Sequence, residues 1–390
     1  MLFLVLSTVA CFVGAARDGY ASCSTIKPWP VDDSFSGERF QKLLVARQND
    51  CARYKPWNIV VSSVGVGATM AHVVRMMGEA FSMNWSFRPI DRVPYLWADE
   101  NPANCSTPQR AVDCYHVPLS YCGFSNSVKG RHEDIIANWS GTDFCQLGQL
   151  TGRSLQWMNE QMHFYALRQR DDIQLKILEN VEPLFRLISS SQFPEPGRTA
   201  GSLSIQLRTG NGDVLDEGRA FEPSLDTYMK YVDDIADRML KRENKILTVV
   251  YLASNNPEKT YISAEHMSRT YPRTFRYYEL PHIHIGVGDP MRAHQANVAG
   301  AAHKYTNYDL HVEFYTDMHI YSHTDYFIGS TSNVQRSASM LRSVYGRANH
   351  TSCRISFTEQ ANPMMCDDDR ATFEPPFHAL FGYEGGTMFA

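Results

Sequence analysis

The chain has 390 residues, of which 43% are hydrophobic, and a formal net charge of −5. This charge, without any long run of Lys or Arg, argues against a nucleic-acid-binding protein. The length and the apolar content are sufficient for two ordinary domains, each with its own core.

The N-terminal segment predicts a protein of the secretory pathway. Residues 2–16 form an apolar run that ends in small residues and is too short to cross about 30 Å of hydrocarbon comfortably. This pattern is typical of a cleavable signal peptide, which we place at residues 1–16. The alternatives are a buried first helix and a short signal anchor, and only a retained anchor would bring the protein to a membrane. No Lys or Arg precedes the run, which disfavours the anchor.

Sequons and cysteines indicate the same compartment. Four Asn-x-Ser/Thr sequons occur, at Asn84, Asn104, Asn138 and Asn349. Eight cysteines follow the signal segment, an even number, as a disulfide framework requires. Five of them lie between positions 51 and 145, and none lies between 146 and 352. Bridges are therefore expected in the N-terminal half and in the tail, where Cys353 and Cys366 could pair.

In the first half of the chain, a lead segment at 17–56 precedes a strand, a glycine turn and a helix. The strand is predicted at 58–62, the turn at Gly65 and Gly67, and the helix at 69–81. Small residues in such a turn let the backbone approach a phosphate beside the unpaired N–H groups of the helix. A tight turn without a ligand is the alternative. Disulfide-tied loops are predicted at 91–150, and helices at 155–168 and 173–189.

The second half alternates strands with helices. Strands are predicted at 202–207, 247–252 and 326–328, and helices after Pro223, at 264–271 and at 308–322. This alternation is typical of an α/β protein with parallel sheets. A segment rich in Pro and Gly near 194–201 separates a first domain at 57–198 from a second at 199–345, and a C-terminal tail follows at 346–390.

Polar residues follow the predicted strands of the second half. Gln206 and Arg208 end one strand, and Ser332 and Asn333 follow another. Ligands of open α/β sheets bind at this carboxyl edge. The planar, permanently charged guanidinium of Arg208 suits a diphosphate, with a surface salt bridge as the alternative. Ser332 and Asn333 could bind phosphate or cap the next helix.

Several short motifs follow one another along roughly residues 57–345. They are Gly65-Val66-Gly67 with His72-Val73-Val74; Trp157, Gln161, Tyr165 and Arg168; Gln206-Leu207-Arg208 with Phe221 and Tyr228-Met229; Tyr251-Leu252-Ala253 with Pro257; and Asp317-Met318-His319, continuing through Asp325-Tyr326-Phe327 to Ser332. In this order, the motifs resemble those of the family-23 glycosyltransferases, which are α1,6-fucosyltransferases of N-glycan cores and bacterial relatives acting on chito-oligosaccharides.

This resemblance implies a GT-B fold, in which two Rossmann-like domains face each other across a cleft and the C-terminal one holds most of GDP-fucose. It assigns Arg208 to the β-phosphate, Asp317 to guanine, and Gly67 and Asn333 to the pyrophosphate. The expected donor-binding set is Gly65, Gly67, Gln206, Arg208, Asp317, Ser332 and Asn333. Neither a metal nor another cofactor is expected, and the acidic run at 367–369 is interpreted as a solvated tail.

The resemblance also implies an inverting transfer of fucose, in which Arg208 stabilises the leaving diphosphate and Glu217 acts as the general base. A solvated loop carboxylate is the alternative for Glu217, because the spacing from Arg208 to Phe221 exceeds that of the family. Two further residues depart from the family's pattern. Thr209 replaces a second arginine, and Gln206 replaces a histidine.

The predicted acceptor is the core GlcNAc of an N-glycan or glycoprotein, fucosylated with an α1,6 linkage in the Golgi lumen. Secretion from the cell is the alternative location. A protein O-fucosyltransferase and an inactive lumenal glycan-binding protein are the alternative functions. Retention of Arg208 and Asp317 argues against the inactive protein.

Overall fold

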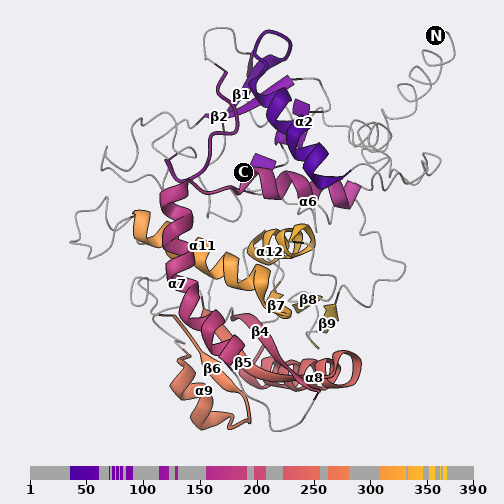
Figure 1. Ribbon diagram of the computed structural model, residues 1–390, viewed down its shortest axis with the longest axis vertical. Coiled ribbons are helices and arrows are strands. Elements are labelled where there is room, and N and C mark those ends of the chain that lie inside the picture. The colour runs from indigo at the N-terminus through magenta and orange to yellow at the C-terminus, as the bar shows by residue number, and fades with distance from the viewer. Residues whose placement is uncertain are drawn as a thin grey trace, which may run out of the picture.

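The computed structural model describes a large part of the chain and has the predicted α/β class (Figure 1). The described residues are 36–60, 70, 73–74, 76–78, 80–81, 85–90, 114–122, 128–130, 155–190, 197–207, 223–254, 262–280, 307–330, 333–345, 351–355, 361 and 363–366. They form two separate sheets with helices packed around them.

The first sheet has three parallel strands in the order β2-β1-β3. These strands are β1 (Lys55–Val60), β2 (Trp85–Ile90) and β3 (Val128–Gly130). Strand β1 overlaps the prediction at 58–62, and the described residues between 70 and 81 are helical, as predicted. Strand β3 lies inside the segment predicted as loops, because three residues are too few to show an alternating pattern.

Two helices enclose the core of this first half. Helix α2 (Gly37–Asn49) begins after Ser36, whose hydroxyl caps it, and it buries Phe40 and Leu44. It contacts α6 (Leu155–Ala166), one of the predicted helices. No element was predicted for the segment that forms α2. The disulfide Cys51–Cys122 ties the turn after α2 to the segment 114–122.

The second sheet has six strands in the order β6-β5-β4-β7-β8-β9. Five are parallel: β4 (Thr199–Leu207), β5 (Lys245–Ser254), β6 (Arg276–Tyr278), β7 (Tyr326–Ser330) and β8 (Thr351–Ile355). The three predicted strands are thus confirmed as β4, β5 and β7. The short β9 (Met364–Cys366) runs antiparallel to β8, and the disulfide Cys353–Cys366 joins them. Both of these strands come from the segment predicted as a tail.

Helices cover both faces of the second sheet. On one face, Ile205 and Leu207 pack against α8 (Leu225–Glu243), which presents Val232 and Ile235. Full burial of such a side chain stabilises the fold by roughly 1.5–3 kcal/mol. Helix α9 (Ala264–Thr270) lies on the same face through Met267. Helix α8 is capped by Ser224 at its start and by Asn244, in the left-handed conformation, at its end.

The opposite face carries α7 (Asp171–Ser190), α11 (Asn307–His323) and α12 (Asn333–Val344). Helix α7 precedes the predicted domain boundary, yet it packs on α11 and β4 of the following sheet. Helix α6 contacts α12, so both halves of the chain meet along these helices (Figure 1). None of the helices in the described ranges is both long and apolar enough to cross a membrane.

A network of mostly buried charged side chains lies at the amino end of the second sheet. Lys245 Nζ lies 2.8 Å from a carboxylate oxygen of both Asp325 and Glu243, and Ser202 donates to Asp325 through its backbone N–H and its hydroxyl. Burial alone would raise the pKa of Asp325, but the hydrogen bonds from Lys245 and Ser202 outweigh it, so the pKa is lowered. The network therefore ties β4, β5 and β7 together through an ionised carboxylate.

Candidate functional site

The second sheet has a topological switch point between β4 and β7. From β4, the chain continues through β5 and β6 on one side of the sheet and later returns through β7 and β8 on the other side. In open α/β sheets, ligands bind outside the carboxyl ends of the strands at such a point. The candidate site is therefore the edge where β4 and β7 end.

The structure brings the predicted residues to this edge only in part. Arg208 follows β4 directly in the sequence and Ser332 follows β7, but both lie outside the described residues, as do Gly65, Gly67 and Glu217. Asn333 is described as the first residue of α12, without its side chain. Only Gln206 and Asp317 can therefore be placed with their side chains.

Gln206 lies on β4, next to its last residue, and is 7% exposed. Successive side chains of a strand alternate between faces, so Gln206 shares a face with Ser202 and Ser204. Ser204 Oγ lies 2.7 Å from Thr324 Oγ1, and Ser202 bonds Asp325. Ser202, Ser204 and Gln206 thus form a row of polar side chains along β4. Gln206 is at the carboxyl end of this row, next to the candidate site.

Asp317 lies on α11 and is half-buried. The hydroxyl of Tyr251 donates a hydrogen bond to Asp317 Oδ1 over 2.5 Å. Tyr251 lies on β5, three residues before the strand ends, and its side chain is completely buried. Burial first, and then the charge of Asp317, raises the pKa of Tyr251 well above its usual value, so this hydroxyl stays protonated and donates.

Two neighbours of Asp317 were not predicted from the sequence. Glu313 lies one turn before Asp317 on α11, and Tyr321 lies one turn after it. Residues four apart share a helix face, so the spacing of Glu313, Asp317 and Tyr321 was a signal that could have found this face. The ring of Tyr321 stacks on Phe327 of β7, with 4.6 Å between the centroids, and lies 6.4 Å from the ring of Tyr251.

Helix α12 approaches β7 very closely at the switch point. A Cβ atom on Gly329 would lie 2.8 Å from the Cβ of Gln335. Real Cβ atoms do not come that close, so the approach requires a residue without a side chain. Gly329 thereby brings the first turn of α12 up to the end of β7.

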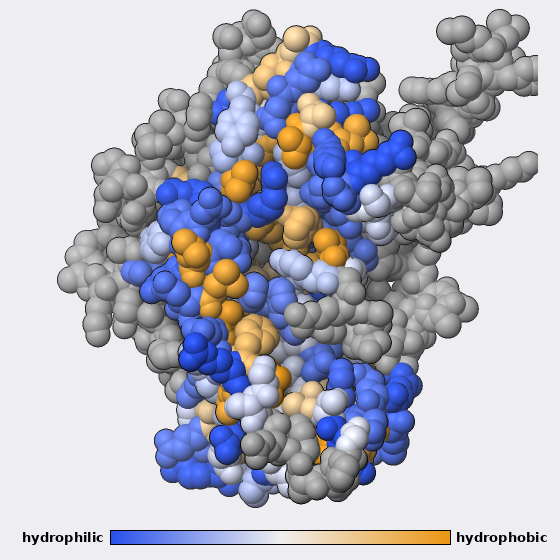
Figure 2. All heavy atoms as spheres, viewed as in Figure 1, coloured by the Kyte–Doolittle hydropathy of each residue, from blue (hydrophilic) through white to orange (hydrophobic). Residues whose placement is uncertain are grey.

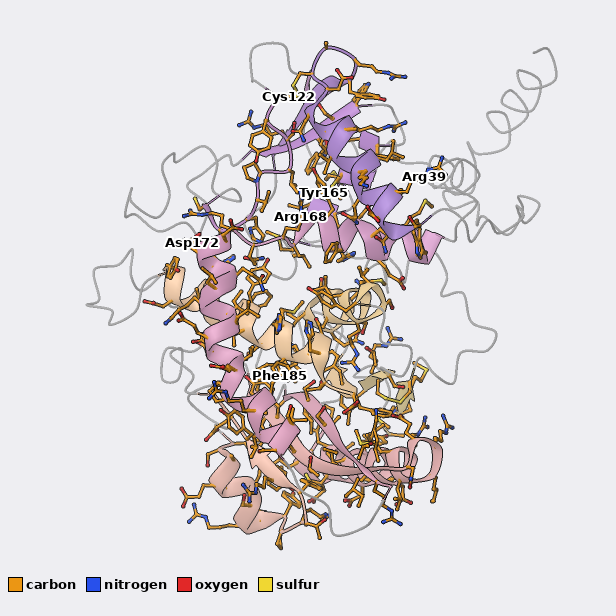
Figure 3. The ribbon with its side chains drawn as sticks, in the orientation of Figure 1. Arg39, Cys122, Tyr165, Arg168, Asp172 and Phe185 are labelled. Carbon is orange, nitrogen blue, oxygen red and sulfur yellow. A yellow bond between two sulfur atoms is a disulfide. The ribbon has the colours of Figure 1, made fainter. Side chains whose placement is uncertain are left out.

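The α6 residues that carried part of the sequence resemblance lie in the first half of the chain. Gln161 accepts hydrogen bonds from Gln41 of α2, and Tyr165 donates to the backbone oxygen of Leu119. The guanidinium of Arg168 lies 3.8 Å from the centroid of the Tyr165 ring (Figure 3). These side chains thus hold α6 against α2 and the segment 114–122.

A second buried cluster lies where the segment 114–122 meets α11. His116 Nε2 lies 2.6 Å from the hydroxyl of Tyr315, and the ring of His311 stacks on Tyr115 with 4.1 Å between the centroids. Among the residues that the structure describes, neither ring nitrogen of His311 has a hydrogen-bond partner. Burial, followed by the proximity of His116, lowers the pKa of His311 well below its usual value.

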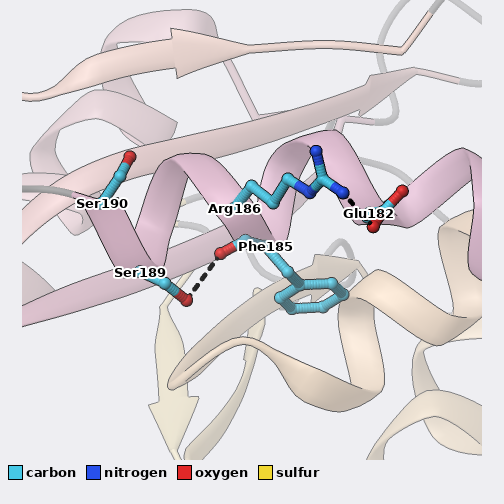
Figure 4. A pocket seen from close by; sticks show the side chains of 5 residues that line it. All are labelled: Glu182, Phe185, Arg186, Ser189 and Ser190. Carbon is cyan, nitrogen blue, oxygen red and sulfur yellow. Dashed lines mark hydrogen bonds and ion pairs between the residues drawn. The ribbon is translucent and has the colours of Figure 1, made fainter.

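Two surface features lie away from the carboxyl edge. A shallow hollow of about 560 Å³ is lined by Glu182, Phe185, Arg186, Ser189 and Ser190 of α7 (Figure 4). Its polar groups bond within the helix, for example Arg186 to Glu182 at 2.6 Å. Figure 2 shows hydrophobic side chains at the surface along α7, a helix in which Leu175 and Leu178 are exposed. Neither feature contains the chemistry expected for nucleotide binding.

Among the residues that the structure describes, no group of three or more His, Cys, Asp or Glu side chains is placed to hold a metal ion. Of the predicted donor-binding residues, the described part of the chain includes Gln206 and Asp317 with their side chains and Asn333 through its backbone. They offer an amide, a carboxylate and N–H donors to a ligand.

No protein-family model matches the chain, and no curated protein matches it. Among solved structures, the fucosyltransferase NodZ from Bradyrhizobium is similar with a TM-score of 0.43 and 11% identity, covering 80% of this chain and 98% of NodZ. A variant of Arabidopsis thaliana FUT1 in complex with GDP is similar with a TM-score of 0.43 and 11% identity, covering 86% of this chain and 82% of FUT1. NodZ is described as an alpha-1,6-fucosyltransferase and was also solved with GDP. These similarities are too low to assign the chain to a family.

Proposed function

We propose that the chain is a GDP-fucose-dependent glycosyltransferase that transfers fucose, with inversion, to a hydroxyl group of a glycan. The proposed acceptor is the core GlcNAc of N-glycans, with an α1,6 linkage, and the proposed compartment is the Golgi lumen. The single observation that carries this proposal is the carboxylate of Asp317, which accepts a hydrogen bond from Tyr251, three residues before the carboxyl end of β5 in the second sheet. The sequence motifs around Arg208 and Asp317 agree with it.

A carboxylate at this position suits guanine better than the other bases. Guanine presents two adjacent donors, N1–H and the exocyclic amine, and a carboxylate has two acceptor oxygens in a matching arrangement. Adenine has an acceptor at N1, and uracil has a single N–H between two carbonyl groups. Asp317 would therefore select GDP over ADP and UDP.

The proposed reaction forms one bond and breaks one bond at the anomeric carbon of fucose. The acceptor oxygen attacks this carbon through a transition state that resembles an oxocarbenium ion, comparable in charge to glycoside hydrolysis. The bond to the β-phosphate breaks, and GDP leaves on the opposite face with the electron pair. The proton of the acceptor hydroxyl passes to Glu217, and Arg208 stabilises the growing charge on GDP.

Transfer from GDP-fucose to a panel of acceptors tests this function. The panel contains N-glycans, chito-oligosaccharides and folded protein acceptors, and mass spectrometry measures the gain of one deoxyhexose. Gain on an N-glycan core, with an α1,6 linkage, is the expected result. Gain only on protein Ser or Thr would identify a protein O-fucosyltransferase, whereas no transfer and no GDP binding would exclude the enzyme.

Two variants connect this test to the proposed residues. Arg208→Ala is expected to abolish transfer without unfolding the protein, and full activity in that variant would discard its assignment. Asp317→Asn replaces one acceptor oxygen by a donor and is expected to weaken GDP binding by about ten- to a hundredfold. The matched control is Asp237→Asn on α8, where the exposed carboxylate pairs with Lys241.

A further inference from the structure

Tyr251 is a completely buried core residue whose hydroxyl bonds a half-buried carboxylate. The side chain is completely buried among apolar residues on the face of the second sheet that α7, α11 and α12 cover. Its hydroxyl donates to Asp317 Oδ1 over 2.5 Å, which joins β5 to α11 across 66 residues of sequence. Tyr251, a residue of the second sheet, thereby holds Asp317, a residue of the candidate site.

Asp317 is half-buried, whereas Tyr251 is completely buried, so the carboxylate of Asp317 is more accessible than the hydroxyl that bonds it. A carboxylate has about four acceptor positions on its two oxygens, and the bond from Tyr251 occupies one of them. A short hydrogen bond to a charged group also restricts rotation of the carboxylate plane. Because burial keeps the Tyr251 hydroxyl protonated, it remains a donor toward Asp317.

We propose that Tyr251 is a positioning residue that orients the Asp317 carboxylate so that both of its oxygens can accept hydrogen bonds from guanine. This inference rests on the proposed function, because it takes GDP as the ligand. Two parallel hydrogen bonds require the carboxylate and the base to lie in one plane. Without the hydrogen bond from Tyr251, the carboxylate of Asp317 rotates out of that plane and keeps one good bond to the base instead of two.

The inference predicts a change in base selectivity, which a merely structural role of Tyr251 would not produce. Inosine diphosphate retains N1–H but lacks the exocyclic amine of GDP. The intact protein is expected to bind GDP about tenfold more tightly than inosine diphosphate, because one hydrogen bond to a charged group is lost. In Tyr251→Phe, this ratio is expected to fall below about threefold.

Isothermal titration calorimetry on the full chain, with GDP, inosine diphosphate and ADP, measures these ratios. Tyr277→Phe is the matched control. Tyr277 lies on β6 of the same sheet, away from Asp317, and its buried hydroxyl donates over 2.9 Å to the backbone oxygen of Tyr271. Tyr251→His restores a ring N–H and is expected to recover part of the selectivity. If Tyr251→Phe does not fold, Tyr251→Met supplies a second replacement without a donor.

The possible outcomes separate this inference from the proposed function. A reduced ratio in the donor-free variants, with an unchanged ratio in Tyr277→Phe, supports the positioning role. If the donor-free variants keep the ratio of the intact protein, the positioning role is overturned and the proposed function stands. If the intact protein binds ADP as tightly as GDP, or binds neither, the proposed function and the positioning role both fail.

Discussion

The imidazole of His116 and the hydroxyl of Tyr315 lie 2.6 Å apart, and their contact joins the segment 114–122 to helix α11. Both side chains are buried. The neighbouring rings of Tyr115 and His311 stack in the same cluster. Because Cys122 of this segment is bridged to Cys51 after α2, the cluster connects the first half of the chain to the helices that cover the second sheet.

Replacing Tyr315 by Phe keeps the ring and removes only the hydroxyl that contacts His116. We expect the free energy of unfolding to fall by about 1–2 kcal/mol, because a buried hydrogen bond is lost while packing is retained. Urea denaturation measures the change. Tyr345→Phe is the control, since that side chain is 39% exposed and its loss of a hydroxyl should cost no more than about 0.5 kcal/mol. Equal effects in the two variants would contradict the role of this contact.

Stability should fall as the pH is lowered below the usual pKa of histidine. Burial lowers the pKa of His163 from 6.5 to about 4, and the buried His311 is shifted in the same direction. Below pH 6.5 the unfolded chain binds protons that the folded protein does not bind, so the free energy of unfolding decreases until the folded pKa is reached. His163 alone accounts for a loss of about 2 kcal/mol between pH 7.5 and pH 5.

Thermal unfolding at pH 7.5 and at pH 5 measures this dependence. His163→Gln removes the titrating ring and retains an amide that can donate to Asn159 O, the acceptor that lies 2.9 Å from His163 Nδ1. We expect this variant to lose part of the acid sensitivity. His266→Gln, on the exposed face of α9, is the control and should retain all of it. An unchanged pH profile in His163→Gln would reject the assignment.

The elements that the sequence predicted best are those with a clear burial pattern. Helix α8 has one apolar face against the sheet, so Tyr228, Val232, Ile235 and Met239 keep the period of a helix. Strands β4, β5 and β7 are buried between helices and appear as apolar runs. In contrast, β3, β6 and β9 have three residues each, and nothing local marks them as strands.

The sequence predicted which positions form the candidate site, but it did not predict which side chains contact one another there. The topology places the ends of β4 and β7 together, as the order of strands and helices indicated. The bond from Tyr251 to Asp317 could not be predicted, because it joins residues 66 positions apart whose meeting depends on how α11 packs on the sheet. The same holds for His116 and Tyr315, which are 199 positions apart.

Replacing Lys245 by Met should strongly destabilise the second sheet. The side chains of Lys245, Asp325 and Glu243 are 18%, 17% and 14% exposed, and the variant leaves two mostly buried carboxylates without their shared cation. We expect a loss of about 2–4 kcal/mol in the free energy of unfolding. Lys241→Met on α8 removes an exposed ion pair with Asp237 and should cost no more than about 0.5 kcal/mol. Chemical denaturation of the two variants compares them, and similar losses would argue against the network.

Gly329→Ala tests whether the close approach of α12 to β7 shapes the candidate site. The added Cβ would meet Gln335 at 2.8 Å, so the start of α12 must move away from β7. We expect a loss of about 1–3 kcal/mol in stability, together with a threefold to tenfold weakening of GDP binding, or about 0.7–1.4 kcal/mol.

Gly197→Ala separates the two effects, because its φ of +86° makes the substitution strained although nothing lies within 4 Å of the new atom. That control should lose about 1–2 kcal/mol of stability and bind GDP normally. If both variants bind GDP as the intact protein does, the start of α12 does not contribute to the nucleotide site.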